Sequence, residues 1–154
     1  MKFLIINGPN INMLGIREPD KYGTMSYPEL VRYISEQAFA MGAETDFFQS
    51  NSEGDIVTAI QNAYNKYDGI VINPAAYTHT SIAILDALTA VALPAAEVHI
   101  TDIKNREPFR AVSYAGMACL FSFIGQGKEG YVNAVRALTE YIINNNDADS
   151  EIQR

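Results

Sequence analysis

Short apolar runs alternate with amphipathic segments along the chain, and this alternation predicts the order of its elements. Residues 2–6 (KFLII), 69–73 (GIVIN) and 94–100 (PAAEVHI) are apolar runs bounded by Gly, Pro or Asn. Such runs are typical of strands that are buried on both faces of a sheet. Residues 43–50 and 117–125 are two further strand candidates.

Four segments between and after these runs have helical periodicity. The first begins at Ser26, which forms a capping-box pattern with Glu29, and it ends at Gly42. The other helical segments cover residues 53–68, 80–93 and 129–145. The polar ending NDADSEIQR is expected to fray, which gives one catalytic α/β domain over residues 1–146 and a polar C-terminal tail over residues 147–154.

Alternating strands and helices predict a parallel sheet with helices on both faces. At this length we expect a single-domain α/β fold with a flavodoxin-like, doubly wound, five-stranded parallel sheet. Ligands of such folds bind beyond the carboxyl ends of the strands. Polar motifs follow three of the predicted strands there: NGPNINMLG, NPAAYTHT and EVHITD.

Composition narrows the classes of partner. The 154 residues carry a net charge of −7, which disfavours binding to nucleic acid and to anionic membranes. No apolar run approaches the length of a membrane span, and the first residues do not resemble a signal peptide. A lone cysteine, Cys119, excludes an intramolecular disulfide, so we expect a cytoplasmic protein.

The segment after the first strand contains Asn7, Gly8, Pro9 and Asn10. These residues have an ordinary explanation as turn formers. Asn side chains also offer a donor and an acceptor without charge, so a role in ligand binding is the alternative. The segment lacks the G-x-G-x-x-G pattern of dinucleotide-binding turns.

Both histidines of the chain, His79 and His99, fall at the predicted ligand edge. Glu97, His99 and Thr101 are spaced by two and therefore point to one side of an extended strand. Glu97 is expected to hold the His99 imidazole in one tautomer and to raise its basicity. No zinc-binding spacing is present, so we expect neither a metal nor another cofactor.

The loop GIREPDKYGT, residues 15–24, holds Arg17 and Tyr22 with little apolar surface around them. One interpretation is a solvated loop with incidental charges. The other is a lid, in which the Arg17 guanidinium lowers the pKa of the Tyr22 phenol and makes it a base for a proton next to a carbonyl.

Four motifs, in order and in register to about residue 131, resemble the type II 3-dehydroquinate dehydratases: IINGPNINMLGIREPDKYG, FFQSNSEGDIV, GIVINPAAYTHTSIAILDAL and EVHITDIKNREPFR. The resemblance implies reversible dehydration of 3-dehydroquinate to 3-dehydroshikimate, in the shikimate route or in quinate catabolism. It implies anti elimination through an enolate with no metal and no Schiff base. It also implies a homododecamer built of trimers.

The resemblance also assigns roles by position. Tyr22 matches the proton-abstracting base, Arg17 its activator, and Asn10 the residue that stabilises the enolate. His99 matches the general acid, with Glu97 as its carboxylate partner. The positions that match substrate-binding residues are Asn73, His79, Asp86 (which reaches a neighbouring subunit's site), Ile100, Thr101 and Arg110. Thr101 stands where serine is more frequent, and Leu85 replaces a frequent arginine.

Three other functions compete with this one on the same fold. A flavin- or nucleotide-binding module would bind phosphate tightly after the first strand. A phosphoacceptor domain needs carboxylates where this chain has Asn7 and Asn73, so it is disfavoured. The third is a purely structural oligomer with a vestigial site, and the presence of Arg17, Tyr22 and His99 together does not support it.

Overall fold

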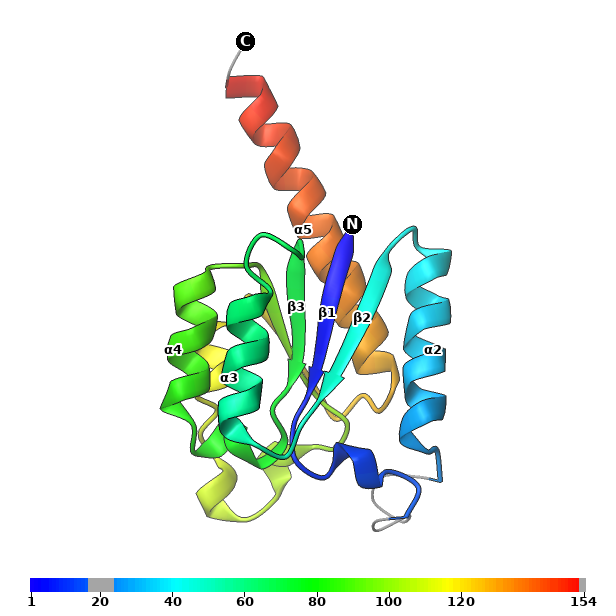
Figure 1. The fold of residues 1–154 in the computed structure, drawn as a ribbon, viewed down its shortest axis with the longest axis vertical. Coiled ribbons are helices and arrows are strands. Elements are labelled where there is room, and N and C mark those ends of the chain that lie inside the picture. Colours follow the sequence, from blue (N-terminus) through cyan, green and yellow to red (C-terminus); the bar gives the residue numbers. More distant parts are fainter. Residues whose placement is uncertain (17–23, 153–154) are drawn as a thin grey trace.

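A computed structural model describes residues 1–16 and 24–152, with side chains described to residue 146. Its centre is a five-stranded, all-parallel sheet in the order β2-β1-β3-β4-β5 (Figure 1). This order is that of a flavodoxin-like fold, so the predicted fold class is confirmed. The strands are β1 (Lys2–Asn7), β2 (Glu44–Gln49), β3 (Gly69–Asn73), β4 (Ala95–His99) and β5 (Phe121–Ile124).

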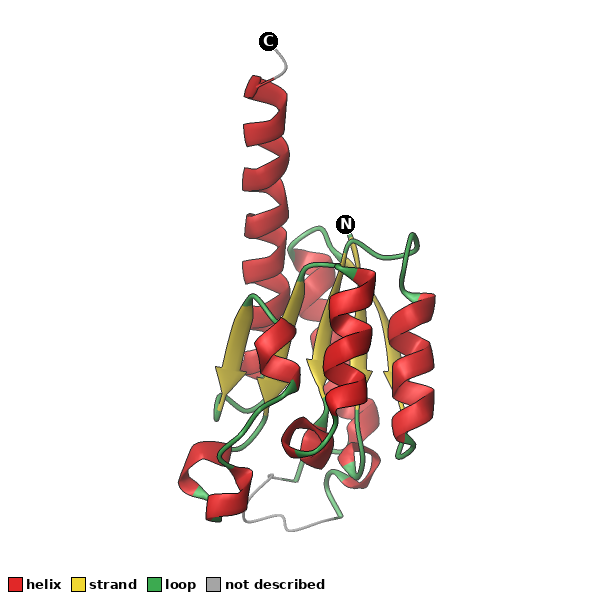
Figure 2. Cartoon of the chain, turned by 90° about the vertical axis from the view of Figure 1, so that its left-hand side faces the viewer, coloured by secondary structure: helices red, strands yellow, loops and turns green. Residues whose placement is uncertain are grey.

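Helices cover both faces of the sheet, as Figures 1 and 2 show. Helices α2 (Tyr27–Ala40) and α5 (Glu129–Ile152) pack on one face, and α3 (Glu53–Asn62) and α4 (Ile82–Val91) pack on the other. Along β1, Phe3 and Ile5 point into the first layer while Leu4 and Ile6 point into the second. Burial on both sides explains why the strands are continuous apolar runs rather than alternating ones.

Local capping sets where the helices begin. Ser26 and Glu29 form the predicted capping box at α2, and Ser52 and Ser81 cap α3 and α4 through their side chains. Helix α3 ends at Asn62, earlier than the predicted 68, because a turn follows in which Asn65 has a φ of 59°. No helix among the described residues is long and apolar enough to cross a membrane.

The C-terminal part of the chain differs from the prediction. Helix α5 continues to Ile152 instead of ending at residue 145, and it projects past the end of the sheet in Figure 2. The predicted helix end at residue 145 is therefore wrong, because the sequence that follows contains neither glycine nor proline to stop the helix. The division into a catalytic domain over residues 1–146 and a polar tail over residues 147–154 stays a prediction. Strand β5 is shorter than predicted, since a 3-10 turn (Ala115–Ala118) occupies the start of the expected run.

Strands β1 and β3 lie side by side at the point where the chain reverses its direction of winding. Asn7 and Asn73 are register partners at their carboxyl ends, and Gly8 N–H donates to Asn73 O at 2.8 Å. A Cβ at Gly8 would lie 2.5 Å from Pro74 O, so only glycine permits this approach. The sequence NGPN therefore brings two loops together at the switch point, where doubly wound folds bind ligands.

We expect Ser81→Ala to destabilise the protein by about 1–2 kcal/mol, because it leaves the Ile84 N–H at the buried start of α4 without its acceptor at 3.0 Å. Thr89→Ala, on the exposed side of the same helix, is the control and should cost much less. Urea unfolding measures both. Equal losses in the two variants would contradict this account of the cap.

Candidate active site

A pocket of about 230 Å³ opens at the carboxyl ends of β1, β3 and β4. It lies between the loops that follow these strands, at the predicted ligand edge. The loops and strand ends supply its lining: Pro9, Asn10, Ile11, Leu14, Asn73, Ala75, Ala76, His79, His99, Ile100, Thr101, Ile103, Arg106 and Arg110.

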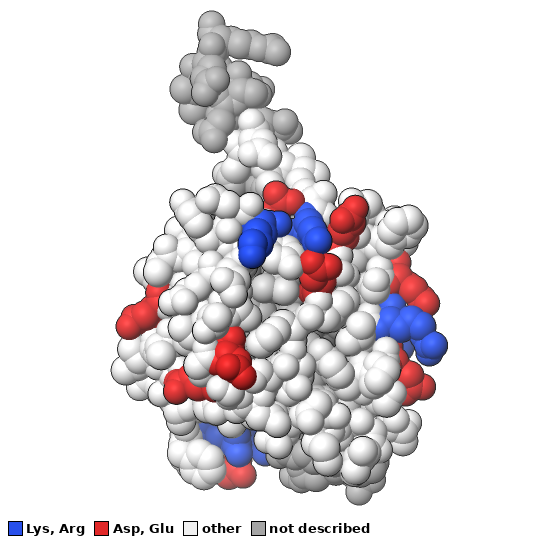
Figure 3. Space-filling model, viewed as in Figure 1, with Lys and Arg blue, Asp and Glu red and all other residues white. Residues whose placement is uncertain are grey.

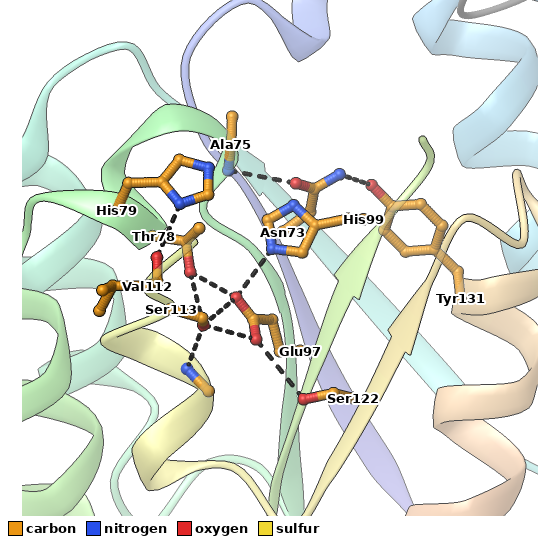
Figure 4. Close-up of polar contacts among 11 residues, drawn as sticks. Asn73, Ala75, Thr78, His79, Glu97, His99, Val112, Ser113, Ser122 and Tyr131 are labelled. Carbon is orange, nitrogen blue, oxygen red and sulfur yellow. Dashed lines mark hydrogen bonds and ion pairs between the residues drawn. The ribbon is translucent and has the colours of Figure 1, made fainter. Parts of the chain in front are cut away.

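Glu97 and His99 form a buried pair on one side of β4, as the spacing of two predicts. His99 Nε2 lies 2.8 Å from Glu97 Oε1, and the two side chains are 4% and 1% exposed. An ionised carboxylate only accepts hydrogen bonds, so Nε2 carries the proton that is shared with Glu97. The other ring nitrogen, Nδ1, points away from the carboxylate, as Figure 4 shows. It is the atom of His99 left for a ligand.

The Glu97 carboxylate also accepts hydrogen bonds from hydroxyl groups of three other segments. Thr78 donates to Oε1, Ser113 lies 2.8 Å from both carboxylate oxygens, and Ser122 lies 3.5 Å from Oε2 (Figure 4). Burial alone raises the pKa of Glu97, but the bonds from His99, Thr78 and Ser113 outweigh it and hold the pKa below its ordinary value. The carboxylate is thus ionised although it is buried.

A glycine makes room for this carboxylate. A Cβ at Gly116 would lie 2.5 Å from Glu97 Oε2 and 2.7 Å from Ser113 Oγ. The Gly116 N–H also donates to Ser113 Oγ at 3.0 Å. The turn that shortens β5 is therefore part of the support for Glu97.

His79 lies beside His99 with its ring nearly parallel, at 17° and a centroid distance of 6.5 Å. Its Nδ1 donates to Val112 O at 2.7 Å, because a carbonyl oxygen can only accept. This bond leaves Nε2 as the acceptor of the neutral ring. One nitrogen of each imidazole is thus bound within the protein, His99 Nε2 to Glu97 and His79 Nδ1 to Val112 O. The other nitrogen of each ring is left for a ligand in the pocket.

Asn10 is held in a left-handed conformation, with a φ of 69°, by a residue that sequence reasoning missed. Asn51 Oδ1 accepts the Asn10 N–H at 3.1 Å, and Gln49 Nε2 lies 3.2 Å from both Asn51 Oδ1 and Gly8 O. Tyr77 donates to Asn51 O at 2.8 Å. These bonds tie the loop after β1 to the loop after β3. Both Gln49 and Asn51 stand in the motif FFQSNSEGDIV, which carries part of the family resemblance.

Two arginines give the pocket a positive character that the whole chain lacks. Arg106 and Arg110 line it, whereas no Asp or Glu is among its described lining residues. Glu107, which does not line the pocket, lies 2.9 Å from Arg110 Nε and 3.6 Å from Arg106 Nε, so one carboxylate stands against two guanidinium groups. On the face in Figure 3, charged side chains lie singly or in small mixed groups without a continuous basic surface. The size of the pocket and its two arginines suit a small anion.

The structure brings most of the predicted site residues together in this pocket. Lining it are Asn10, Asn73, His79, His99, Ile100, Thr101 and Arg110, with Glu97 behind His99. Arg17 and Tyr22 lie outside the described residues. Asp86 is exposed on α4 and does not line the pocket.

Sequence reasoning missed Thr78, Ser113, Arg106 and Asn51. Arg106 stands in the quoted motif EVHITDIKNREPFR, four residues before Arg110, and an arginine pair after a site strand was an available signal. Thr78 and Ser113 carry no such signal, because their role depends on the position of Glu97. Among the described residues, no group of three His, Cys, Asp or Glu side chains could hold a metal ion.

Comparison with known proteins identifies similar chains. Residues 1–139 match the family model described as Dehydroquinase class II. A 3-dehydroquinate dehydratase of Fusobacterium nucleatum is 52% identical over 144 residues, covering 92% of this chain and 98% of the relative. One from Clostridium perfringens is 50% identical over 143 residues, with the same two coverages.

A solved structure agrees with these matches. The type II dehydroquinase from Butyrivibrio crossotus superposes with a TM-score of 0.88 at 48% sequence identity. The alignment covers 90% of this chain and 97% of that one. The family match over residues 1–139 includes all five strands and every lining residue of the pocket.

We expect the stability difference between the wild type and Glu97→Gln to depend on pH. Because the pKa of Glu97 is lower in the folded than in the unfolded protein, its carboxylate stabilises the fold above about pH 4.5. This contribution is lost as the pH falls through the lowered folded-state value. Urea unfolding of both proteins, at pH 7 and at pH values below 4.5, should therefore show a difference that shrinks in acid.

Glu140→Gln, which removes an exposed carboxylate of α5, is the matched control and should change stability little at either pH. A difference between the wild type and Glu97→Gln that stays constant across this range would mean that the buried carboxylate is not the group involved.

Proposed function

The chain belongs to the class II dehydroquinase family, and we infer from this that it dehydrates 3-dehydroquinate to 3-dehydroshikimate, a step of the shikimate pathway. The observation that carries the proposal is the buried Glu97–His99 pair at the pocket of a chain that matches the family over residues 1–139. The enzyme is a hydro-lyase, and its partner is a small-molecule substrate.

The reaction sets two requirements on the site. A proton leaves a carbon next to the ketone, and the electron pair that remains forms an enolate. The enolate then re-forms the ketone while the neighbouring C–O bond breaks, and the departing hydroxyl needs a proton to leave as water. In an anti elimination, the base and the acid stand on opposite faces of the ring.

Tyr22 is the base and Arg17 keeps it ionised. A guanidinium beside a phenol favours the phenolate, which lowers the pKa of the tyrosine towards the working range. Asn10 stands at the edge of the pocket with its backbone held by Asn51, and its amide stabilises the enolate oxygen. These roles follow from the match of each position to the family's motif.

His99 is the general acid on the other face. When the imidazole is protonated, Nε2–H remains on Glu97 and the transferable proton stands on Nδ1, which is the nitrogen that points away from the carboxylate. The Glu97 carboxylate stabilises the imidazolium and fixes the plane of the ring. The proton of Nδ1 goes to the departing hydroxyl, and solvent returns the enzyme to its starting state.

The remaining lining residues bind the substrate. Asn73 and His79 offer uncharged donors and acceptors to its hydroxyl groups. The backbone N–H groups at Ile100 and Thr101, together with Arg110, bind its carboxylate. Arg106 adds a second cation to the same pocket.

The protein self-associates as a dodecamer of trimers in the cytoplasm. Support comes from a groove beside α4, which Met117, Leu120 and Tyr141 line with 66%, 48% and 37% of their surface exposed. Apolar surface of this kind is typical of subunit contacts. Asp86, exposed on α4 away from its own pocket, completes a neighbouring subunit's site.

Tyr22→Phe is expected to lower kcat by at least about a hundredfold while the protein stays folded, because the variant lacks the base. The assay follows the conjugated enone of the product after 3-dehydroquinate is added. Tyr64→Phe removes an exposed phenol that does not line the pocket and should retain full activity. Near-normal turnover by Tyr22→Phe would show that another group is the base.

Wild-type turnover itself tests the proposed function, and its absence would refute it. A chelator should not inhibit it, and borohydride should trap no lysine adduct, because the route uses neither a metal ion nor a Schiff base.

Light scattering is expected to give a mass of about twelve times the 17.0 kDa of one chain. Met117→Asp places a charge on the apolar groove and should lower that mass. A wild-type protein with the mass of a single chain would contradict the proposed assembly.

A further inference from the structure

One buried phenol takes no part in the scheme above, although it contacts a residue of the pocket. Tyr131 lies on α5, and its side chain has no exposed surface. Its hydroxyl lies 2.7 Å from Asn7 Oδ1 and 2.8 Å from Asn73 Nδ2, so it bridges the ends of β1 and β3. Asn73 Oδ1 in turn lies 3.1 Å from the backbone nitrogen of Ala75 (Figure 4).

The direction of every bond in this chain of contacts is fixed. The Ala75 N–H can only donate, so the amide oxygen of Asn73 faces it and the amide nitrogen faces Tyr131. The phenol oxygen then accepts from Asn73 and has its single proton left for Asn7 Oδ1. Burial raises the pKa of Tyr131 well above its ordinary value, so the phenol keeps this proton at every working pH.

We propose that Tyr131 is a positioning residue, which sets the orientation of the Asn73 amide in the pocket and thereby the affinity for the substrate. The inference rests on the proposed function, in which Asn73 binds substrate. Asn73 is only 2% exposed, yet it lines the pocket, so the surface that it offers a ligand is narrow. A flipped amide would exchange a donor for an acceptor at that surface.

The same bonds hold the wall of the pocket next to Asn73. Ala75 lines the pocket with a φ of 51°, in the left-handed region that non-glycine residues rarely adopt. The bond from its N–H to Asn73 Oδ1 supports this conformation. Removing the Tyr131 hydroxyl would loosen the amide that keeps Ala75 in place.

Tyr131→Phe tests the inference, because it removes the hydroxyl and keeps the ring in the core. With 3-dehydroquinate we expect KM to rise about tenfold, the effect of one lost hydrogen bond, and kcat to change less. Tyr67→Phe is the matched control, since its phenol donates to Asp46 at 2.8 Å away from the pocket. It should leave KM unchanged.

A double-mutant cycle with Asn73→Ala separates positioning from a general structural role. If Tyr131 acts through Asn73, Tyr131→Phe has no further effect on KM once Asn73 is alanine. Equal effects of Tyr131→Phe in both backgrounds, or an unchanged KM in the single variant, would overturn the inference. If Tyr131→Phe does not fold, Asn7→Ala removes the acceptor of the phenol proton instead, and an unchanged KM there overturns the inference too.

The two proposals fail differently. A wild type without turnover refutes the proposed function, whereas an active wild type with no KM change in these variants refutes only the role of Tyr131.

Discussion

The burial of one ionised carboxylate is the constraint around which the site is built. Glu97 is 1% exposed on the interior strand β4, and such a charge is tolerated only when it is paired and hydrogen-bonded. His99, Thr78, Ser113 and Ser122 supply those contacts from β4, the loop after β3, the segment before β5 and β5 itself. The hydrogen bonds to the Glu97 carboxylate therefore fix the relative positions of these segments, which form one side of the pocket. It also leaves His99 with a single free nitrogen for chemistry.

The other side of the pocket depends on the approach of two strands. Gly8 allows β1 and β3 to meet at the switch point, and their last residues, Asn7 and Asn73, are joined through Tyr131. The loops that follow β1 and β3 therefore begin at residues whose positions are fixed. Asn73 and His99 thus stand at the ends of strands whose positions are fixed by these contacts, which orients their side chains in the pocket.

The sequence predicts those features of the fold and the site that depend on residues close together in the chain. Most element positions and the common face of Glu97 and His99 follow from apolar runs, caps and the period of two along a strand. The parallel sheet follows from the alternation of strands and helices, and its doubly wound order from the length of the chain. Thr78, Ser113 and Tyr131 could not be found this way, because they meet their partners only in the folded chain. The length of α5 was missed because the polar ending was expected to fray, although it contains neither glycine nor proline to stop a helix.

A crystal structure with a substrate analogue bound is the most direct test of the central claim, that a carboxylate-held imidazole protonates the departing hydroxyl. The account predicts that the oxygen of that hydroxyl lies within hydrogen-bond distance of His99 Nδ1 while Nε2 remains on Glu97. The Tyr22 oxygen should approach the acidic carbon from the opposite face of the ring. An analogue whose hydroxyl lies away from His99, or a His99 ring turned off Glu97, would contradict it.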